Sequence, residues 1–316
     1  MHRDLNTGME ASARSDFISS SKLKVIAALI EARGSIPLAA RMAGVSKQYI
    51  YEVLKGMKSI GIKLRYIPSF SALGRVFLTF TYSGNLPSND LTVFRLKVYT
   101  FDGSIGSVAV YVLPNNLSST AITVPRNATI IELIDVFPSA PWTHITELRS
   151  DEDRADLKVR ATTLDEEDKA ILAALYEDFS APVTGVLPGV SKSRLSYHFR
   201  LHVKPLLRVF LDTHPLRMHA KPLIFSEVRA VNEGWLSALL KAREVYLVMP
   251  KKNSLVAYVL LDLNDTFVFL KEVSTAIREK GLGLHIKLLG YVDPDESEKV
   301  RIPRVFTPVY TGLRTE

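Results

Sequence analysis

The sequence predicts an α+β fold in which one helical unit and one sheet-forming unit each occur twice. Residues 24–62 and 169–207 match without a gap at a constant offset of 145, and nine of these 39 positions are identical. A repeat of this kind fixes the architecture and is therefore considered first. Each copy has helical periodicity, and short apolar segments typical of strands follow it. We therefore expect a tandem repeat of a winged helix-turn-helix, the head, and a β-α-β-β-α-β unit, the body.

The first head is predicted to contain three helices and a strand. The helices are expected over residues 23–32, 37–42 and 46–59. Pro37 suits the first turn of the second helix, and Ser46 is a good N-cap for the third. Gly44 supplies the tight turn between them, which is typical of a helix-turn-helix. Residues 62–66 alternate apolar and basic side chains, and they resemble the wing strand of a winged helix.

The second head carries the same signals at the offset of 145. Gly185, Gly189 and Leu195 repeat the small residue, the turn glycine and the apolar anchor of the first copy. An alternating segment over 207–211 repeats the wing strand. Two such motifs in register are more specific than either alone.

The exposed face of the last helix in each head is predicted to enter the major groove of DNA, as in other helix-turn-helix proteins. Glutamine can read adenine and arginine can read guanine by paired hydrogen bonds, whereas lysine and serine hold phosphates. The side chains assigned to DNA are Ser46, Lys47, Gln48, Tyr51, Glu52, Lys55, Lys63 and Arg65 in the first copy, and Lys192, Ser193, Arg194, Ser196, Tyr197 and Arg200 in the second.

The distribution of charge points to the same partner. The net charge is +7, and residues 21–66 alone carry nine Lys/Arg against two Asp/Glu. Residues 191–208 carry five Lys/Arg and no acid. Basic charge concentrated in the repeated segments is expected of a protein that binds nucleic acid, although a solvated lysine-rich face would look the same.

Two histidines of the second head have the spacing of metal ligands. His198 and His202 lie four residues apart, on one face of the predicted helix. They align with Val53 and Met57, on the inner side of the helix or at its flank. We therefore expect packing histidines, with no metal site and no other cofactor.

Behind each head the pattern becomes that of a sheet. In the first body, strands are expected over 76–82, 105–113, 120–124 and 144–148, with helices over 90–99 and 127–136. In the second body, strands are expected over 223–228, 244–249, 255–261 and 284–291, with helices over 235–242 and 266–280. This is the ferredoxin-like order, an antiparallel sheet with helices on one face. The other face must be buried, so the two sheets are expected to pack on each other.

These elements divide the chain into seven segments. They are a polar tail (1–20), the first head (21–67), the first body (68–150), a linker (151–164), the second head (165–215), the second body (216–295) and a C-terminal tail (296–316).

A head followed by such a body resembles the Lrp/AsnC family of transcriptional regulators. The resemblance rests on Ala43-Gly44-Val45-Ser46, Gly61-Ile62 and Ala72-Leu73-Gly74, and it covers nearly the whole chain. The second copy departs from this pattern at Leu206 and at Met218-His219. Because family members usually dimerise through their bodies, the chain resembles such a dimer fused into one polypeptide. The resemblance implies a regulator of double-stranded DNA that responds to a small-molecule effector such as an amino acid, acting as a monomeric pseudo-dimer or as a homodimer.

Composition excludes several other classes of protein. The longest wholly apolar run, Leu255–Leu261, has seven residues, against ~20 for a membrane-spanning helix. The absence of cysteine excludes disulfides and thiolate metal sites. The N-terminal residues do not resemble a signal peptide. We therefore expect a cytoplasmic protein with no membrane partner.

The sequence favours a DNA-binding transcriptional regulator over an enzyme. There is no P-loop, and Gly281-Leu282-Gly283 does not continue into a dinucleotide fingerprint. One alternative is a non-specific chromatin or RNA-binding protein whose heads use charge alone. Another is a sirohaem-decarboxylase-like enzyme, since those enzymes share the winged-helix-plus-body architecture. Such an enzyme would need arginine and histidine gathered in the bodies, which offer mainly His144 and His285.

Overall fold

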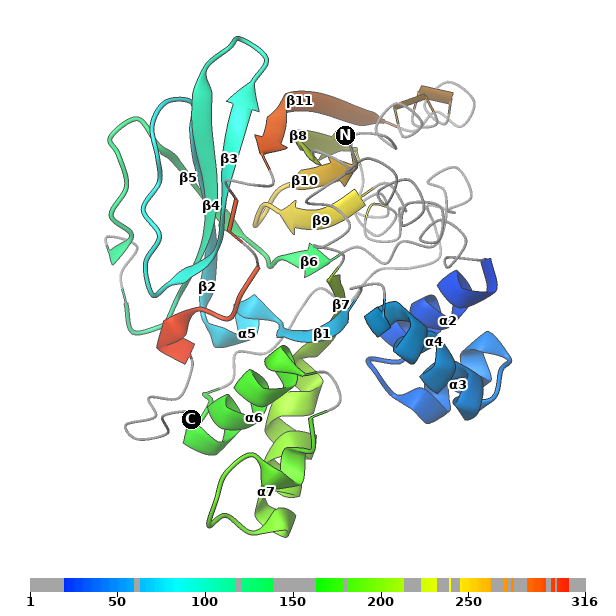
Figure 1. The fold of residues 1–316 in the computed structure, drawn as a ribbon. Helices are drawn as coiled ribbons and strands as arrows, with labels where there is room; N and C mark the ends of the chain where they lie inside the picture. Colours follow the sequence, from blue (N-terminus) through cyan, green and yellow to red (C-terminus); the bar gives the residue numbers. More distant parts are fainter. Residues whose placement is uncertain are drawn as a thin grey trace, which may run out of the picture.

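The computed structural model is a mixed α+β protein in which two groups of helices lie beside a large antiparallel sheet (Figure 1). None of the helices described is long and apolar enough to cross a membrane. The structure describes residues 20–59, 63–117, 121–138, 163–178, 181–212, 223–231, 239, 245–262, 270–271, 274–275, 283–293, 297–298 and 300–306.

Within the described residues, the large sheet has nine strands and consists of two halves. Across the sheet, the first half is β5 (Thr129–Leu133), β2 (Arg75–Thr81), β4 (Ile105–Leu113) and β3 (Thr92–Thr100). The second half is β11 (Leu284–Asp293), β8 (Leu223–Ala230), β10 (Val256–Asp262), β9 (Val245–Pro250) and the short β6 (Phe137–Pro138). We number the four longer strands of each half by their order along the chain. Across the sheet they then lie in the order 4-1-3-2, which is the strand order of a split β-α-β arrangement.

One chain segment supplies both ends of the sheet, so the sheet closes on itself. β5 pairs with β2 at one end, and β6, three residues further on, pairs with β9 at the other. Between them the Ile134 amide donates to the Pro250 carbonyl at 2.8 Å, and the Lys252 amide donates to the Glu132 carbonyl at 2.9 Å. At the other junction β3 pairs with β11. β3, the second strand of the first half, thus pairs with β11, the fourth strand of the second. β9, the second strand of the second half, pairs with β6, which directly follows the fourth strand of the first half along the chain, so the two junctions are related as in an isologous dimer.

The inside of the closed sheet holds the main hydrophobic core. Val76 and Leu78 of the first half belong to the same buried cluster as Leu247, Met249 and Leu260 of the second. The two sheets therefore face each other through their apolar sides, which buries the surface that either half alone would expose.

The outer face of the first half is covered by loops. Leu86, in the loop after β2, and Ile122, in the loop after β4, pack there against Phe77 and Tyr111. On the second half, the outer face forms a separate cluster that includes Leu239. The two halves therefore share a strand order but differ in what covers them.

The two helices predicted in the first body are wrong. Residues 90–99 and 127–136 contain β3 and β5 instead. Phe94, Leu96 and Val98 are buried and alternate with more exposed neighbours, so the apolar period of this segment is two rather than 3.6. The strand predicted over 120–124 is also wrong, because its described residues, 121–124, lie outside any strand.

The second body forms its predicted strands as β8, β9, β10 and β11. Its predicted helices, over 235–242 and 266–280, fall mostly outside the described residues. The positions of these segments that are described, 239, 270–271 and 274–275, are helical. The strand predicted over 144–148 also lies outside the described residues.

Most of the described helices lie in the two heads. The first head contains α2 (Ser20–Glu31), α3 (Ile36–Ala43) and α4 (Lys47–Ser59), and β1 (Lys63–Pro68) and α5 (Phe70–Leu73) follow it. The second contains α6 (Glu166–Glu177), the 3₁₀ turn η3 (Val183–Gly185), α7 (Lys192–His198), the π turn η4 (Phe199–Val203), the 3₁₀ turn η5 (Lys204–Leu206) and β7 (Leu207–Asp212). A last 3₁₀ turn, η6 (Arg304–Phe306), lies near the end of the described chain.

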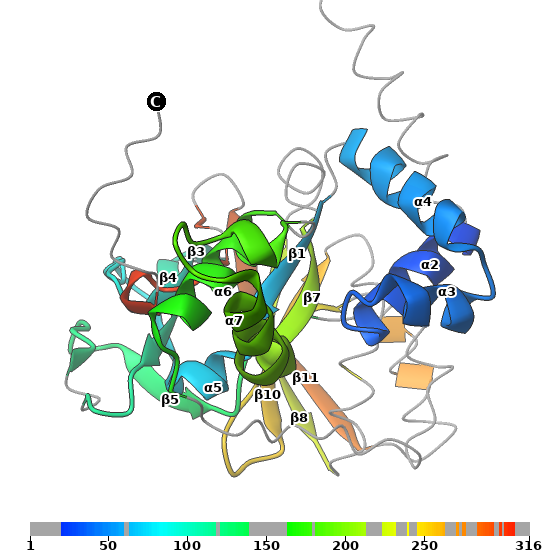
Figure 2. The ribbon, with the colours of Figure 1, turned by 90° about the horizontal axis from the view of Figure 1, so that it is seen from below.

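The strands predicted as wings form one ribbon between the heads. β1 and β7 pair antiparallel with each other, and Arg65 lies opposite Phe210, its own counterpart at the offset of 145. The helices of the two heads lie on opposite sides of this ribbon (Figure 2). The segments predicted as wing strands are thus strands, but neither forms a wing of its own head, because each pairs with the strand of the other copy.

Candidate nucleic-acid interface

The first head builds its helix-turn-helix around small and apolar residues. Ala39 and Ala40 of α3 are buried together with Ile50, Val53 and other residues of α4. Gly44 ends α3 with φ of 69°, a left-handed conformation that glycine adopts without strain. Alanine allows the two helices to approach closely, and the glycine turns the chain sharply between them.

The N-terminus of α4 is capped as predicted. The Ser46 hydroxyl accepts a hydrogen bond from the Tyr49 amide at 3.1 Å, which satisfies one of the unpaired amides of the first turn. This cap begins α4 at Lys47 and so determines which side chains face solvent.

The face of α4 assigned to DNA is solvent-exposed. Every residue of α4 assigned to DNA is exposed to solvent, and Tyr51 exposes 55% of its surface. The amide of Gln48 donates to Glu52 at 3.4 Å, so these two side chains already orient one another. Ile50, Val53 and Met57 are buried on the other side, with Leu54 only partly buried. The exposed side thus combines an amide, an aromatic ring and two lysines.

The second head lacks the middle helix of the motif. Where the first head has α3, residues 181–188 contain only η3. Thr184, Gly185 and Pro188 occupy the positions of three alanines in α3, and each of these residue types disfavours a helix interior. The turn itself is kept, since Gly189 has φ of 82°. The second copy therefore keeps the glycine turn of the motif without its middle helix.

The assigned face of the second head is engaged in internal contacts. Lys192, Ser193 and Tyr197 are exposed on α7, and Ser196 is half-buried. Nη2 of Arg194 lies 2.6 Å from a carboxylate oxygen of Glu167 on α6. Nε of Arg200 donates to the Ser196 carbonyl at 3.3 Å. Two of its three assigned basic side chains are thus held by the second head itself.

The basic residues assigned to the wing lie in the central ribbon. Lys63 belongs to β1, and its side chain lies outside the described part of the structure. Arg65 is half-buried: its Nη1 donates to the Tyr176 carbonyl at 3.1 Å, and its guanidinium lies 5.4 Å from the centre of the Tyr176 ring. The structure therefore places Arg65 between β1 and α6, not on a projecting wing.

The two heads differ strongly in charge. Residues 21–66 carry +7, whereas the equivalent residues 166–211 carry six Lys/Arg and five Asp/Glu, which leaves +1. The acids lie mainly at the N-terminus of α6, where they suit the helix dipole. The basic surface is therefore concentrated on the first head.

A buried ion pair that the sequence pattern did not predict anchors the ribbon to the closed sheet. Asp135, fully buried between β5 and β6, lies 2.9 Å from Nη1 of Arg208 on β7. Its carboxylate also accepts from the amides of Phe70 and Val136 and from the hydroxyl of Ser69. Arg208 in turn donates to the Ser69 hydroxyl at 3.1 Å. The only sequence signal for this ion pair was an isolated aspartate in an apolar segment, Ile134-Asp135-Val136.

Comparison with family models, with curated proteins and with solved structures finds no match to this chain. The proposals below therefore rest on the residues and their geometry.

Proposed function

We propose that the protein is a DNA-binding transcriptional regulator whose principal reading element is α4 of the first head. The observation that carries this proposal is the exposed face of α4, where Gln48 and Tyr51 lie between Lys47 and Lys55. Glutamine can make a paired contact with adenine, and lysines on either side can neutralise phosphates. A capped helix behind a tight glycine turn is the usual scaffold for such a face.

The finer architecture belongs to the same proposal. The two heads act as a tandem pair of helix-turn-helix units, and the two halves of the closed sheet act as fused, ferredoxin-like bodies in the manner of an Lrp/AsnC regulator. The strands that pair between the halves and the shared β1–β7 ribbon support this interpretation, since a fused dimer needs both. A small-molecule effector, such as an amino acid, remains a prediction from the resemblance.

Selection of binding sites from randomised double-stranded DNA with the full chain tests the proposal. A regulator should enrich a defined sequence, and its affinity should fall steeply with salt because each neutralised phosphate releases counterions. Enrichment of no motif, with binding of many sequences, would favour the non-specific chromatin or RNA-binding alternative. The internal contacts of Arg194 and Arg200 argue against base reading by the second head.

The selected site should also be asymmetric if one chain uses both heads. Gln48 and Tyr51 on α4 correspond to Ser193 and Ser196 on α7, so the two faces present different chemistry. A homodimer with identical readers would instead select a palindrome with half-sites about 34–36 Å apart. Footprinting, together with the mass of the complex, distinguishes the two arrangements. One chain bound to a palindrome would refute the use of two unlike readers.

A further inference from the structure

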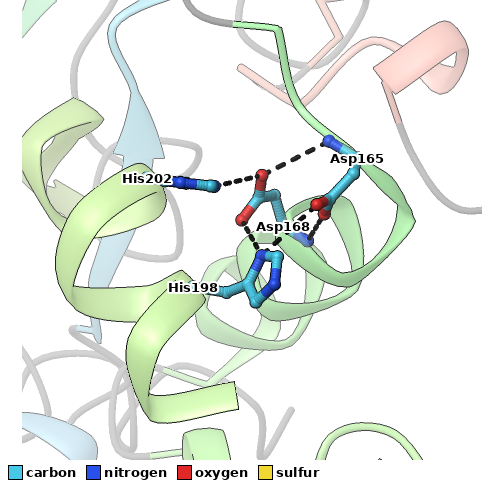
Figure 3. Close-up of side chains that lie close together, drawn as sticks. All are labelled: Asp165, Asp168, His198 and His202. Carbon is cyan, nitrogen blue, oxygen red and sulfur yellow. Dashed lines mark hydrogen bonds and ion pairs between the residues drawn. The ribbon is translucent and has the colours of Figure 1, made fainter. Parts of the chain in front are cut away.

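The second head contains a compact cluster of two histidines and two aspartates (Figure 3). Asp165 and Asp168 come from the start of α6, whereas His198 ends α7 and His202 lies in the π turn η4. One ligand-type atom from each residue can be chosen so that all four lie within 4.8 Å of one another. The cluster therefore joins the first helix of this head to its last.

Single separations between these atoms are close to those between the ligands of a tetrahedral metal ion. His198 and His202 contact different oxygens of Asp168, and the four ligand atoms lie within 4.8 Å of one another. Nδ1 of His198 lies 3.0 Å from Oδ1 of Asp168 and 3.4 Å from Oδ2 of Asp165, and Nδ1 of His202 lies 3.1 Å from Oδ2 of Asp168. Ligands of Zn²⁺ at 2.0–2.1 Å from the ion lie about 3.3 Å apart in a tetrahedron. Small movements of the side chains would thus convert direct contacts into shared coordination.

The cluster gathers acidic groups around a buried carboxylate. The Asp168 side chain is completely buried, and the contacts described for its carboxylate come from His198, His202 and the Asp165 amide. His198 faces carboxylates with both ring nitrogens, because its Nε2 lies 3.7 Å from Oε2 of Glu167. A neutral imidazole has only one N–H, so one of these nitrogens presents a lone pair to a carboxylate. A ring that carries both N–H groups would satisfy the carboxylates on its two sides, and a cation between Nδ1 and the two aspartates would do so as well.

The surroundings resemble the outer shell of a metal site. Oδ1 of Asp165 accepts from the Asp168 amide at 2.9 Å, which leaves Oδ2 directed at His198. Glu167, held by Arg194 at 2.6 Å, is placed to orient His198 through its other nitrogen. Carboxylates behind ligand histidines fix the ring and the tautomer in many metal sites. The capping box of α6 and the hydrogen bonds of both histidines to Asp168 bring the four groups together, and the same groups offer four ligand atoms to a cation.

We propose that Asp165, Asp168, His198 and His202 form a structural Zn²⁺ site that ties α6 to α7 and the π turn. Two imidazole nitrogens and two carboxylate oxygens are a ligand set that Zn²⁺ accepts, and four protein ligands make the site closed and structural. The two aspartates balance the charge of the ion. The site holds the second head in shape where the middle helix of the motif is missing.

Titration of the metal-free full chain with Zn²⁺, in competition with a chromophoric chelator, tests this site. One ion should bind per chain, Co²⁺ should give the intense visible spectrum of tetrahedral coordination, and Zn²⁺ should raise the midpoint of thermal unfolding by mass action. The half-buried His202 is the safest ligand to remove, and His202→Ala should weaken binding by at least about a hundredfold, more than is usual for outer-shell changes.

Two further variants keep the result interpretable. Glu167→Gln leaves all four ligands in place and should weaken binding by about 10–100-fold. His285→Ala, at an exposed position on β11, should leave binding unchanged. Equal binding by wild type and His202→Ala would overturn the proposal and indicate adventitious binding elsewhere. Lack of binding by the folded wild-type chain would also overturn it, and would leave the cluster as a hydrogen-bonded clamp.

Discussion

The two heads share a sequence pattern but differ in their helices, their charge and their buried polar groups. The first has three regular helices, a basic surface and an apolar interior at Val53 and Met57. The second has a 3₁₀ turn in place of the middle helix, a nearly balanced charge, and His198 and His202 at the corresponding positions. We propose from this comparison a division of roles, in which the first head reads DNA and the second supports the closed sheet.

Removing the ion pair that connects the second head to the closed sheet should have the largest effect on stability. Asp135→Ala leaves Arg208 without its buried partner and several amides without an acceptor. We expect the free energy of unfolding, measured by urea denaturation, to fall by about 3–5 kcal/mol. Glu132→Ala is the control, since its ion pairs with Arg75 and Lys252 are partly exposed and each contributes about 0–1 kcal/mol. Similar losses in both variants would show that Asp135 is not a special anchor.

Neutralising the two lysines of α4 should produce the next largest effect. Lys47→Ala with Lys55→Ala should weaken DNA binding about thirtyfold at 0.15 M salt on every sequence, because each phosphate contact contributes a slope of about 0.9 in log K against log salt. The matched double variant of the second head is Lys192→Ala with Arg200→Ala. Fluorescence anisotropy at several salt concentrations measures both. An equal change in the two slopes would remove the proposed difference between the heads.

Base reading should also be confined to the first head. Gln48→Ala should relax preference at one or two base pairs, with a cost of about 1–3 kcal/mol for the lost paired contact. Ser193→Ala, at the equivalent position of α7, should leave the selected sequence unchanged. Site selection with both variants decides, and a changed motif for Ser193→Ala would make the second head a reader too.

The smallest effect concerns the missing helix of the second head. Gly185 has no left-handed φ, and open space surrounds the position of an added Cβ. Gly185→Ala should therefore stabilise the fold by about 0.4–1 kcal/mol, mainly by restricting the unfolded chain. Gly189→Ala should destabilise it by about 1–2 kcal/mol, since φ there is 82°. The midpoint of thermal unfolding should rise for Gly185→Ala and fall for Gly189→Ala. Movement in the same direction would contradict this account of the glycine turn.

Local signals predicted much of the first head and the second body. Pro37, Ser46 and Gly44 placed the helix ends of the first head nearly where they lie, because capping and turn preferences act over a few residues. The apolar runs of the second body gave its four strands. The first body was predicted less well, because residues 90–99 and 127–136 were assigned to helices and contain strands. The two-residue period of β3 was a contrary signal in the sequence itself.

The interface could be predicted only in part for a similar reason. Helical phase identified the exposed face of α4, but it could not reveal that Glu167 of α6 would hold Arg194, or that Tyr176 would hold Arg65. These contacts join residues 27 and 111 positions apart, and no local pattern encodes them. The same holds for Asp168, which the sequence shows only as part of a favourable N-terminal turn.

The sequence by itself determined the duplication, the helix-turn-helix signals and the concentration of basic charge in the first head, since these depend on composition, spacing and short-range preferences. Only the tertiary structure decided that the edge strands of the two halves pair with each other, that β1 pairs with β7, and that two aspartates contact two histidines. Pairing of strand edges and convergence of side chains depend on which distant segments pack together. That choice is governed by burial of the whole apolar surface rather than by any local segment.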